Sequence, residues 1–197
     1  MVVIKICFKI RNFVIYDIID TKAVIKLMIE IVDYNEKWPL KYAAEANDIR
    51  NIISSNLVSI YHIGSTAIKG LKARAVIDVL IVVKKIEVID ELKKQFEKLN
   101  YVCCKDELDR YCFKKNDGSF CLYVFSVEDV KEIEKYLAIS LYLKEHSEVA
   151  SEYTDLKMKI ANKYRNDKKY IKEKNKFITK IENDACNWYQ SKNIHVV

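Results

Sequence analysis

The chain has 197 residues and a formal net charge of +6; half of its residues are hydrophobic and 31% are charged. This charge content argues against a membrane protein, and the many isoleucine, leucine, valine and aromatic residues argue against disorder. A chain of this length predicts one folded domain, or one domain with an appended helical part.

The N-terminal segment is apolar, but three basic residues interrupt its first twenty positions. It therefore lacks the uninterrupted apolar stretch of a signal peptide or a membrane span. A second methionine, Met28, opens the first segment with regular strand and loop patterning. We expect residues 1–27 to be an extension outside the domain, residues 28–190 to form the domain and residues 191–197 to be a tail.

The six cysteines form neither a Cys-x-x-Cys pair nor a Cys/His cluster with the spacing of a zinc site. Because no secretion signal is evident, the simplest interpretation is a cytoplasmic protein with reduced thiols and no membrane partner.

Hydrophobic periodicity predicts the elements in chain order. They are a short strand or extended segment at 29–33, a helix at 39–56 that begins at the only proline, strands at 59–63 and 75–83, a helix at 85–99, strands at 101–104, 109–115 and 119–125, and helices at 129–145 and 147–190 with breaks near 146–147 and 166–167. The glycine-containing turn at 116–119 indicates a hairpin. The pattern predicts an α+β fold, with a mixed β-sheet flanked by helices and a helical C-terminal half.

Positive charge is concentrated in residues 156–180, which hold ten Lys or Arg against two Asp or Glu. A basic segment of this kind can contact phosphate or nucleic acid, whereas its ordinary interpretation is a solvated helix face. We favour the ordinary interpretation, and among ligands we favour a nucleotide or another phosphorylated small molecule over RNA.

Glycine is rare, with three residues where an average composition would have roughly fourteen. Gly64, Ser65 and Thr66 follow the strand at 59–63 and precede a predicted short helix. Glycine lets the backbone turn tightly and approach a ligand, and the amides at a helix N-terminus favour an anion. The segment predicts phosphate contact, with an ordinary strand-to-helix turn as the alternative.

Asp78 is the only charged residue in the apolar strand at 75–83. A carboxylate in a strand that is covered on both faces is unfavourable unless it is paired, hydrogen-bonded or bound to a metal. Two interpretations stay open: an ion pair with an arginine such as Arg74 or Arg110, and contact with a metal or nucleotide.

Together these residues resemble the core pattern of the nucleotidyltransferase superfamily, which has the polymerase-beta-like fold. In that pattern a hydrophobic-Gly-[Gly/Ser] turn is followed, after a short spacer, by Asp-hydrophobic-[Asp/Glu]-hydrophobic. Gly64, Ser65 and Asp78 match its first half and its spacing, but Leu80 occupies the position of the second carboxylate.

The sequence is still more similar to the GrpB family, also called UPF0157, within that superfamily. The segments "HIGSTAI" at 62–68 and "IDV" at 77–79 occur in family order. The C-terminal half continues the resemblance with the Tyr-x-x-Leu-Lys helix "EYTDLKMKIANKY" and the closing segment "YIKEKNKFI", which contains Tyr170 and Lys174. The resemblance extends from about residue 29 to residue 189.

The resemblance implies a nucleotidyltransferase in which Asp78 is the catalytic residue and a Mg²⁺ ligand. The nucleotide-binding residues that we infer with it are Gly64, Ser65, Thr66, His62, Arg74, Arg110 and Lys174. Nucleotidyl transfer uses two carboxylates to hold Mg²⁺, so the leucine at position 80 leaves activity open. A carboxylate from elsewhere, such as Glu107 or Asp109, is a candidate replacement.

The departures from the family pattern favour weak or lost catalysis. Two strand histidines of the family appear here as Cys121 and Tyr123, and an Arg-Asp pair of a following helix appears as Ser140 and Leu141. The alternative hypothesis is a non-catalytic domain that binds a nucleotide or a coenzyme A-related molecule, or assists protein folding. It follows from the family's occurrence fused to dephospho-CoA kinase.

His62 has two interpretations, a hydrogen-bonded structural residue, which we prefer, and a phosphate contact. Ser65 as a covalent nucleophile would need a base nearby, and His62 is only a weak candidate for that base.

Overall fold

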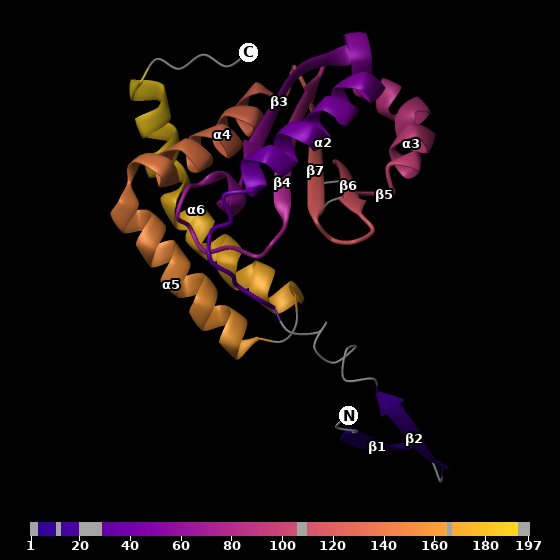
Figure 1. The fold of residues 1–197 in the computed structure, drawn as a ribbon. Coiled ribbons are helices and arrows are strands. Elements are labelled where there is room, and N and C mark those ends of the chain that lie inside the picture. The colour runs from indigo at the N-terminus through magenta and orange to yellow at the C-terminus, as the bar shows by residue number, and fades with distance from the viewer. Residues whose placement is uncertain (1–3, 11–12, 20–28, 106–109, 165–166, 193–197) are drawn as a thin grey trace.

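The structure is a computed structural model that describes residues 4–10, 13–19, 29–105, 110–164 and 167–192. Its larger sheet has five strands in the order β3-β4-β7-β6-β5 (Figure 1). These strands are β3 (Leu57–Ile63), β4 (Ile77–Val83), β5 (Tyr101–Lys105), β6 (Tyr111–Lys115) and β7 (Phe120–Ser126). Strands β4 and β7 are parallel and the other neighbours are antiparallel, so the sheet is mixed.

The helices confirm the predicted α+β class. They are α2 (Trp38–Ile53), α3 (Val88–Lys98), α4 (Val130–Glu145), α5 (Ser147–Lys163) and α6 (Asp167–Ser191), with short 3₁₀ turns η1 (Ser54–Asn56) and η2 (Ser65–Ala67). The N-terminal segment contains β1 (Ile4–Ile10) and β2 (Phe13–Ile19), which pair with each other in a separate two-stranded sheet. Most predicted elements are observed, because hydrophobic periodicity follows local geometry.

Two local features refine the predictions. The segment at 29–33, expected as a short strand or an extended segment, forms an isolated bridge between Val32 and Ala73 and is not a strand. The expected helix after Gly64 is the three-residue turn η2, whose backbone bonds are Ala67 N–H to Gly64 O and Ile68 N–H to Ser65 O. This turn is too short to act as the helix N-terminus on which the phosphate prediction relied.

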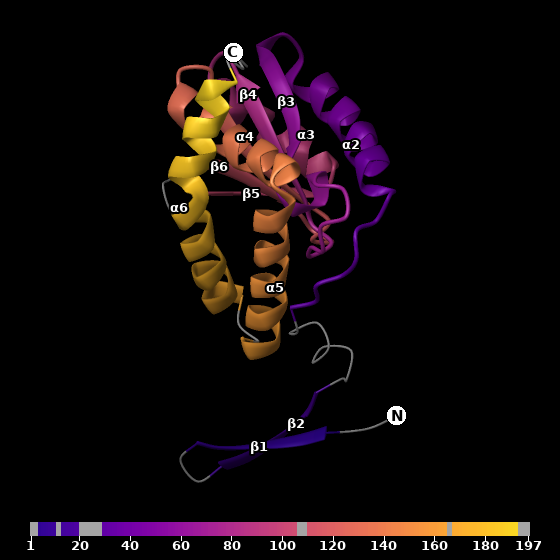
Figure 2. The same cartoon turned by 90° about the vertical axis from the view of Figure 1, so that its left-hand side faces the viewer.

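Helices cover both faces of the sheet, with α2 and α3 on one face and α4 and α6 on the other (Figure 2). Alternate side chains of β4 therefore enter different cores. Ile77, Val79 and Ile81 pack with α2 and α3, whereas Leu80 and Val82 pack with α4 and α6. Asp78 shares the face of Leu80, so its carboxylate points toward the C-terminal helices.

A third apolar cluster ties the segment after Gly64 to the C-terminal helices. Ile68 and Leu71 pack with Leu143 of α4, Tyr153 of α5 and Ile181 of α6. This contact holds η2 against α5, and it thereby sets the position of the residues around Ser65.

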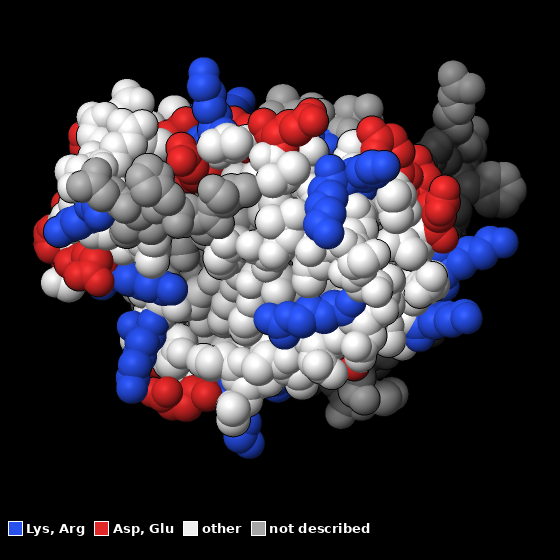
Figure 3. Space-filling view, turned by 90° about the horizontal axis from the view of Figure 1, so that it is seen from above, with Lys and Arg blue, Asp and Glu red and all other residues white. Residues whose placement is uncertain are grey.

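The surface seen from above carries scattered Lys, Arg, Asp and Glu side chains around a largely uncharged centre (Figure 3). Helices α5 and α6, which contain most of the basic segment 156–180, extend away from this face (Figure 1). Among the described residues, no helix has both the length and the apolar character that a membrane crossing requires.

Candidate functional site

Gly64 brings the backbone of the turn directly against Asp78. The last residue of β3, Ile63, lies opposite Asp78 in β4, and Gly64 follows with φ = 70°. A Cβ atom at position 64 would lie 2.5 Å from Asp78 Oδ2. Glycine is therefore required here both by the left-handed backbone conformation and by the space that the carboxylate occupies.

The Asp78 carboxylate is surrounded by donors and cations from three elements. Tyr123 of β7 donates a long hydrogen bond of 3.4 Å to Asp78 Oδ1. Burial raises the pKa of Asp78, while the charges of Lys174 and Arg74 lower it. Protein atoms enclose the carboxylate, whereas the residue as a whole keeps partial access to solvent. We call Asp78 and the side chains around it the Asp78 site.

Helix α6 contributes Lys174 and Tyr170 to this site. The pKa of Lys174 is lowered, mainly by burial and also by the charge of Arg74, whereas the charge of Asp78 acts in the opposite direction. One helical turn earlier, the buried ring of Tyr170 lies 5.7 Å from the guanidinium of Arg74. The two residues are four positions apart and so lie on one face of the helix.

Helix α5 contributes Lys157, a residue that the sequence analysis did not single out. Its side chain is only 2% exposed, and its ammonium donates to Ser65 Oγ at 3.1 Å and to the backbone carbonyl of Lys72. Burial lowers the pKa of Lys157 to about 7, and the charge of Lys174 acts in the same direction. Tyr153 and Lys157 repeat the four-residue spacing of Tyr170 and Lys174, and this repeat is the signal that could have identified Lys157.

His62 is hydrogen-bonded within the turn. Its Nε2 lies 3.0 Å from Thr66 Oγ1, which itself donates to the carbonyl of Val76 at 3.3 Å. Because the Thr66 hydroxyl proton is used in that bond, His62 Nε2 must be the donor to Thr66. Burial lowers the pKa of His62 to about 4, with a further contribution from Lys144, so the ring is neutral and stacks on Tyr42 at 4.8 Å.

Arg110 lies elsewhere on the sheet. It forms an ion pair of 2.8 Å with Glu132 and packs 5.1 Å from the ring of Phe125, which pairs with Val82 at the far end of β4 from Asp78. Of the residues selected from the sequence, the structure brings together His62, Gly64, Ser65, Thr66, Arg74, Asp78 and Lys174. It does not bring Arg110 to this group.

A two-metal site does not fit the residues that the structure describes. Leu80 of β4 occupies the position of the second carboxylate, and its side chain is completely buried against helices α4 and α6. The candidate replacements Glu107 and Asp109 lie outside the described residues. Within the described ranges, no three His, Cys, Asp or Glu side chains gather in an arrangement that could hold a metal ion.

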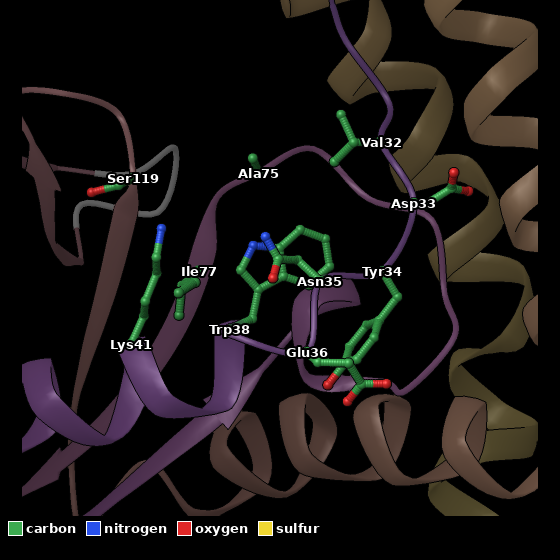
Figure 4. Close-up of a pocket in the computed structure, with 10 residues that line it drawn as sticks. All are labelled: Val32, Asp33, Tyr34, Asn35, Glu36, Trp38, Lys41, Ala75, Ile77 and Ser119. Atoms are coloured by element: carbon green, nitrogen blue, oxygen red, sulfur yellow. The ribbon is translucent and has the colours of Figure 1, made fainter.

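A hollow of about 580 Å³ opens on the face of the sheet opposite to the Asp78 site (Figure 4). It is lined by Tyr34, Trp38, Lys41, Ile77 and Ser119 among others, with the Tyr34 and Trp38 rings edge to face at 5.3 Å. Ile77 and Asp78 are consecutive in β4 and point to opposite faces. The sheet therefore separates this hollow from the Asp78 site.

The family model described as "GrpB protein" matches residues 28–184. The chain belongs to the GrpB family. The resemblance inferred from the sequence motifs is thereby confirmed. Among relatives, this GrpB chain is similar to UPF0157 protein YqkA of Bacillus subtilis, with 30% identity over 172 residues that cover 85% of the chain and 50% of YqkA. The chain thus spans half the length of that relative.

Other GrpB relatives are matched over most of their length. Glutamate-rich protein GrpB of Alkalihalophilus pseudofirmus is 28% identical over 163 residues, which cover 78% of this chain and 94% of the relative. The crystal structure of conserved protein GrpB from Enterococcus faecalis superposes with a TM-score of 0.77 at 29% identity, covering 82% of this chain and 99% of that one. A more distant similarity is to Cid1, described as having RNA terminal uridylyl transferase activity, with a TM-score of 0.45 and 19% identity over 70% of this chain and 44% of Cid1.

Proposed function

We propose that this GrpB-family chain binds a phosphorylated small molecule, such as a nucleotide, at the Asp78 site, without two-metal nucleotidyl transfer. The observation that carries the proposal is the gathering of basic side chains there. Among the described residues, Arg74 and Lys174 lie close enough to Asp78 to lower the pKa of its carboxyl, and Lys157 lies close to Lys174.

These basic side chains favour an anionic ligand. Lys174 lowers the pKa of Lys157, and Arg74 lowers the pKa of Lys174, which means that these groups repel one another where water is scarce. A phosphate dianion would offset this repulsion and accept charge-assisted hydrogen bonds. The Ser65 hydroxyl, which is partly exposed and already bound to Lys157, offers a further polar contact.

The burial of the basic side chains favours a small molecule over RNA. Lys157 is almost fully buried, and Asp78 and Lys174 are enclosed on most sides, so these groups are not spread along an open surface. A nucleic-acid backbone needs an open groove lined with accessible cations.

The same surroundings argue against catalysis by metal-bound triphosphate. The Asp78 carboxylate already faces two cations and the Tyr123 hydroxyl, and no second carboxylate among the described residues joins it. Mg²⁺ sites for phosphoryl transfer use one or two carboxylates together with substrate phosphates. The second candidate, Mg²⁺-dependent nucleotidyl transfer, is supported by the Gly64-Ser65 and Asp78 motif.

Thermal shift of the full chain separates the two candidates. The ligands are inorganic phosphate, ATP, UTP, coenzyme A and dephospho-CoA, each with Mg²⁺ and with EDTA. A ligand at one hundred times its Kd stabilises the folded state by about 2.7 kcal/mol, which is readily measured as a raised Tm. We expect a Mg²⁺-independent shift that Lys174→Met abolishes.

Two matched controls accompany this experiment. Lys172→Met removes an exposed lysine of the same helix, and Arg110→Met removes an arginine that lies away from the Asp78 site. Both variants should keep the ligand-dependent rise in Tm. A flat response to every ligand would overturn the proposal. A shift that requires Mg²⁺ and disappears in Asp78→Asn would favour nucleotidyl transfer instead.

A further inference from the structure

Ser65 and Lys157 meet in an arrangement that suits a nucleophile and its base. Their Oγ and Nζ atoms are 3.1 Å apart, and the second contact of Nζ is the backbone carbonyl of Lys72. In the protonated form, Nζ donates to both the Ser65 hydroxyl and this carbonyl. A neutral lysine amine has two N–H donors and one lone pair. The carbonyl can only accept and so takes an N–H, whereas the Ser65 hydroxyl can rotate and donate its proton to the lone pair.

The surroundings of Lys157 favour the neutral amine. Lys174 of α6 is the charged group that faces it across the helix pair, and burial together with this charge holds the pKa of Lys157 at about 7. On its own helix, Tyr153 lies with its ring 4.5 Å from the Lys157 ammonium, and burial raises the pKa of Tyr153, so the phenol stays neutral. A buried lysine whose pKa is lowered in this way can serve as a general base near neutral pH.

We propose that Ser65 and Lys157 form a nucleophile–base pair that transfers acyl groups from an ester or thioester carrying an anionic group. The anionic part of this substrate rests on the proposed function, since Arg74 would hold it. The serine is partly exposed and the lysine is almost fully buried, which lets a substrate reach the nucleophile and keeps water from the base.

Acyl transfer fits the site better than phosphoryl transfer. Phosphoryl transfer depends on cations, usually Mg²⁺, that neutralise charge on several oxygens at once, and the described residues gather no three His, Cys, Asp or Glu side chains that could hold such an ion. Acyl transfer needs a nucleophile, a base and positive charge near one developing oxyanion. Lys174, whose charge acts on Lys157, supplies that positive charge.

The reaction balances without any further reagent. Ser65 Oγ attacks the carbonyl carbon, its proton passes to Lys157 Nζ, and the carbonyl π electrons move onto oxygen. When the intermediate collapses, the bond to the alkoxide or thiolate breaks and Lys157 returns the proton to the leaving group. Water then attacks the Ser65 ester by the same route, which releases a carboxylic acid and restores the hydroxyl.

A fluorophosphonate probe tests the pair, because such probes react covalently with activated serines. The full chain is treated with the probe, and the modified residue is located by intact-protein and peptide mass spectrometry. We expect modification of Ser65 at a rate that rises with pH around 7. Lys157→Met should slow it by about 100-fold, within the range that a general base contributes. Lys159→Met, an exposed lysine on the same helix, should label like the wild type.

Two variants separate a base from a positioning residue. Ser65→Ala should not be labelled in the peptide that contains position 65. Lys157→Arg keeps the positive charge but cannot act as a base at neutral pH, so it should also lose labelling. Circular dichroism of each variant establishes that it is folded.

Absence of labelling at Ser65 in the folded wild type, or equal labelling in Lys157→Arg, would overturn the proposal. Failure of this inference is distinguishable from failure of the proposed function. A phosphate-dependent thermal shift without Ser65 labelling would leave the binding site in place and remove the nucleophile.

Discussion

Both faces of the sheet bury charged side chains, but the charges form a tight ion pair on one face and a looser group on the other. On the α2 face, Lys115 lies 2.6 Å from both oxygens of Glu45, and Tyr101 donates to Glu45 Oε1 at 2.9 Å. On the α4 and α6 face, the charges of Lys174 and Arg74 act on the carboxylate of Asp78, and Tyr123 donates to it at 3.4 Å.

The difference separates a closed ion pair from a group of charges to which the proposed function assigns a ligand. Glu45 and Lys115 satisfy each other in a tight pair that is mostly buried. Around Asp78, by contrast, the charge of Arg74 lowers the pKa of Lys174, so two neighbouring cations repel each other. Under the proposed function, a bound anion would offset this repulsion.

The largest expected effect is at the tight ion pair. Lys115→Met leaves the Glu45 carboxylate buried without its cation, and we expect a loss of about 3–5 kcal/mol in the free energy of unfolding. Urea denaturation measures it. The double variant Glu45→Gln with Lys115→Met should regain most of the loss, because the amide carries no charge. A loss below about 1 kcal/mol in the single variant would contradict the contrast between the two faces.

The second effect concerns the contact between Gly64 and Asp78. Gly64→Ala should destabilise the protein by about 3 kcal/mol, since it combines a positive φ with a collision against the carboxylate. Gly118→Ala is the matched control: its φ is 74°, but no atom lies within 4 Å of the added carbon, so only about 1 kcal/mol is expected. Equal losses in the two variants would show that the carboxylate does not restrict position 64.

The smallest effect is the change in stability at pH 7 in Lys157→Met, and it belongs to a pH dependence at the Asp78 site. The pKa of Lys157 is about 7 in the folded chain and 10.5 for an ordinary lysine, so the unfolded chain binds more protons between these values. The free energy of unfolding should therefore rise with pH from about 7 to about 10. In Lys157→Met this rise should be smaller, and stability at pH 7 should increase by about 1 kcal/mol.

Thermal unfolding at pH 7 and pH 9.5 measures this dependence. Lys159→Met, with its exposed ammonium, should keep the slope of the wild type. If stability rises equally with pH in the wild type and in Lys157→Met, the Lys157 amine does not titrate between pH 7 and pH 9.5. That result would contradict a lowered pKa of Lys157 at the Asp78 site.

Local patterns in the sequence predicted most of the elements and part of the site. The apolar run of β4, with Asp78 inside it, and the glycine turn before it were recognisable because they depend on neighbouring residues. A hydrogen-bonded His62 was one of two interpretations, and the structure has a hydrogen bond between His62 and Thr66. The helix expected after Gly64 is a single 3₁₀ turn, since packing against α4, α5 and α6 overrides local preference there.

The members of the site that are distant in the chain could not be found in this way. Lys157 reaches Ser65 across 92 positions, and Arg110 turns away from Asp78 toward Glu132. Within the basic segment, Lys157 differs from the exposed Lys159 in being the lysine of the Tyr-x-x-Leu-Lys motif, four residues after Tyr153, but this motif does not indicate that it contacts Ser65.

The sequence by itself determined the family and the α+β class, because these follow from local patterns of glycine, apolar residues and one carboxylate. Only the tertiary structure decided how many cations face that carboxylate. Coulomb interactions depend on distance through space and on the surrounding water, and both are set by the packing of α5 and α6 on the sheet. The balance of charge at Asp78, and with it the chemistry of the site, was therefore settled by the fold.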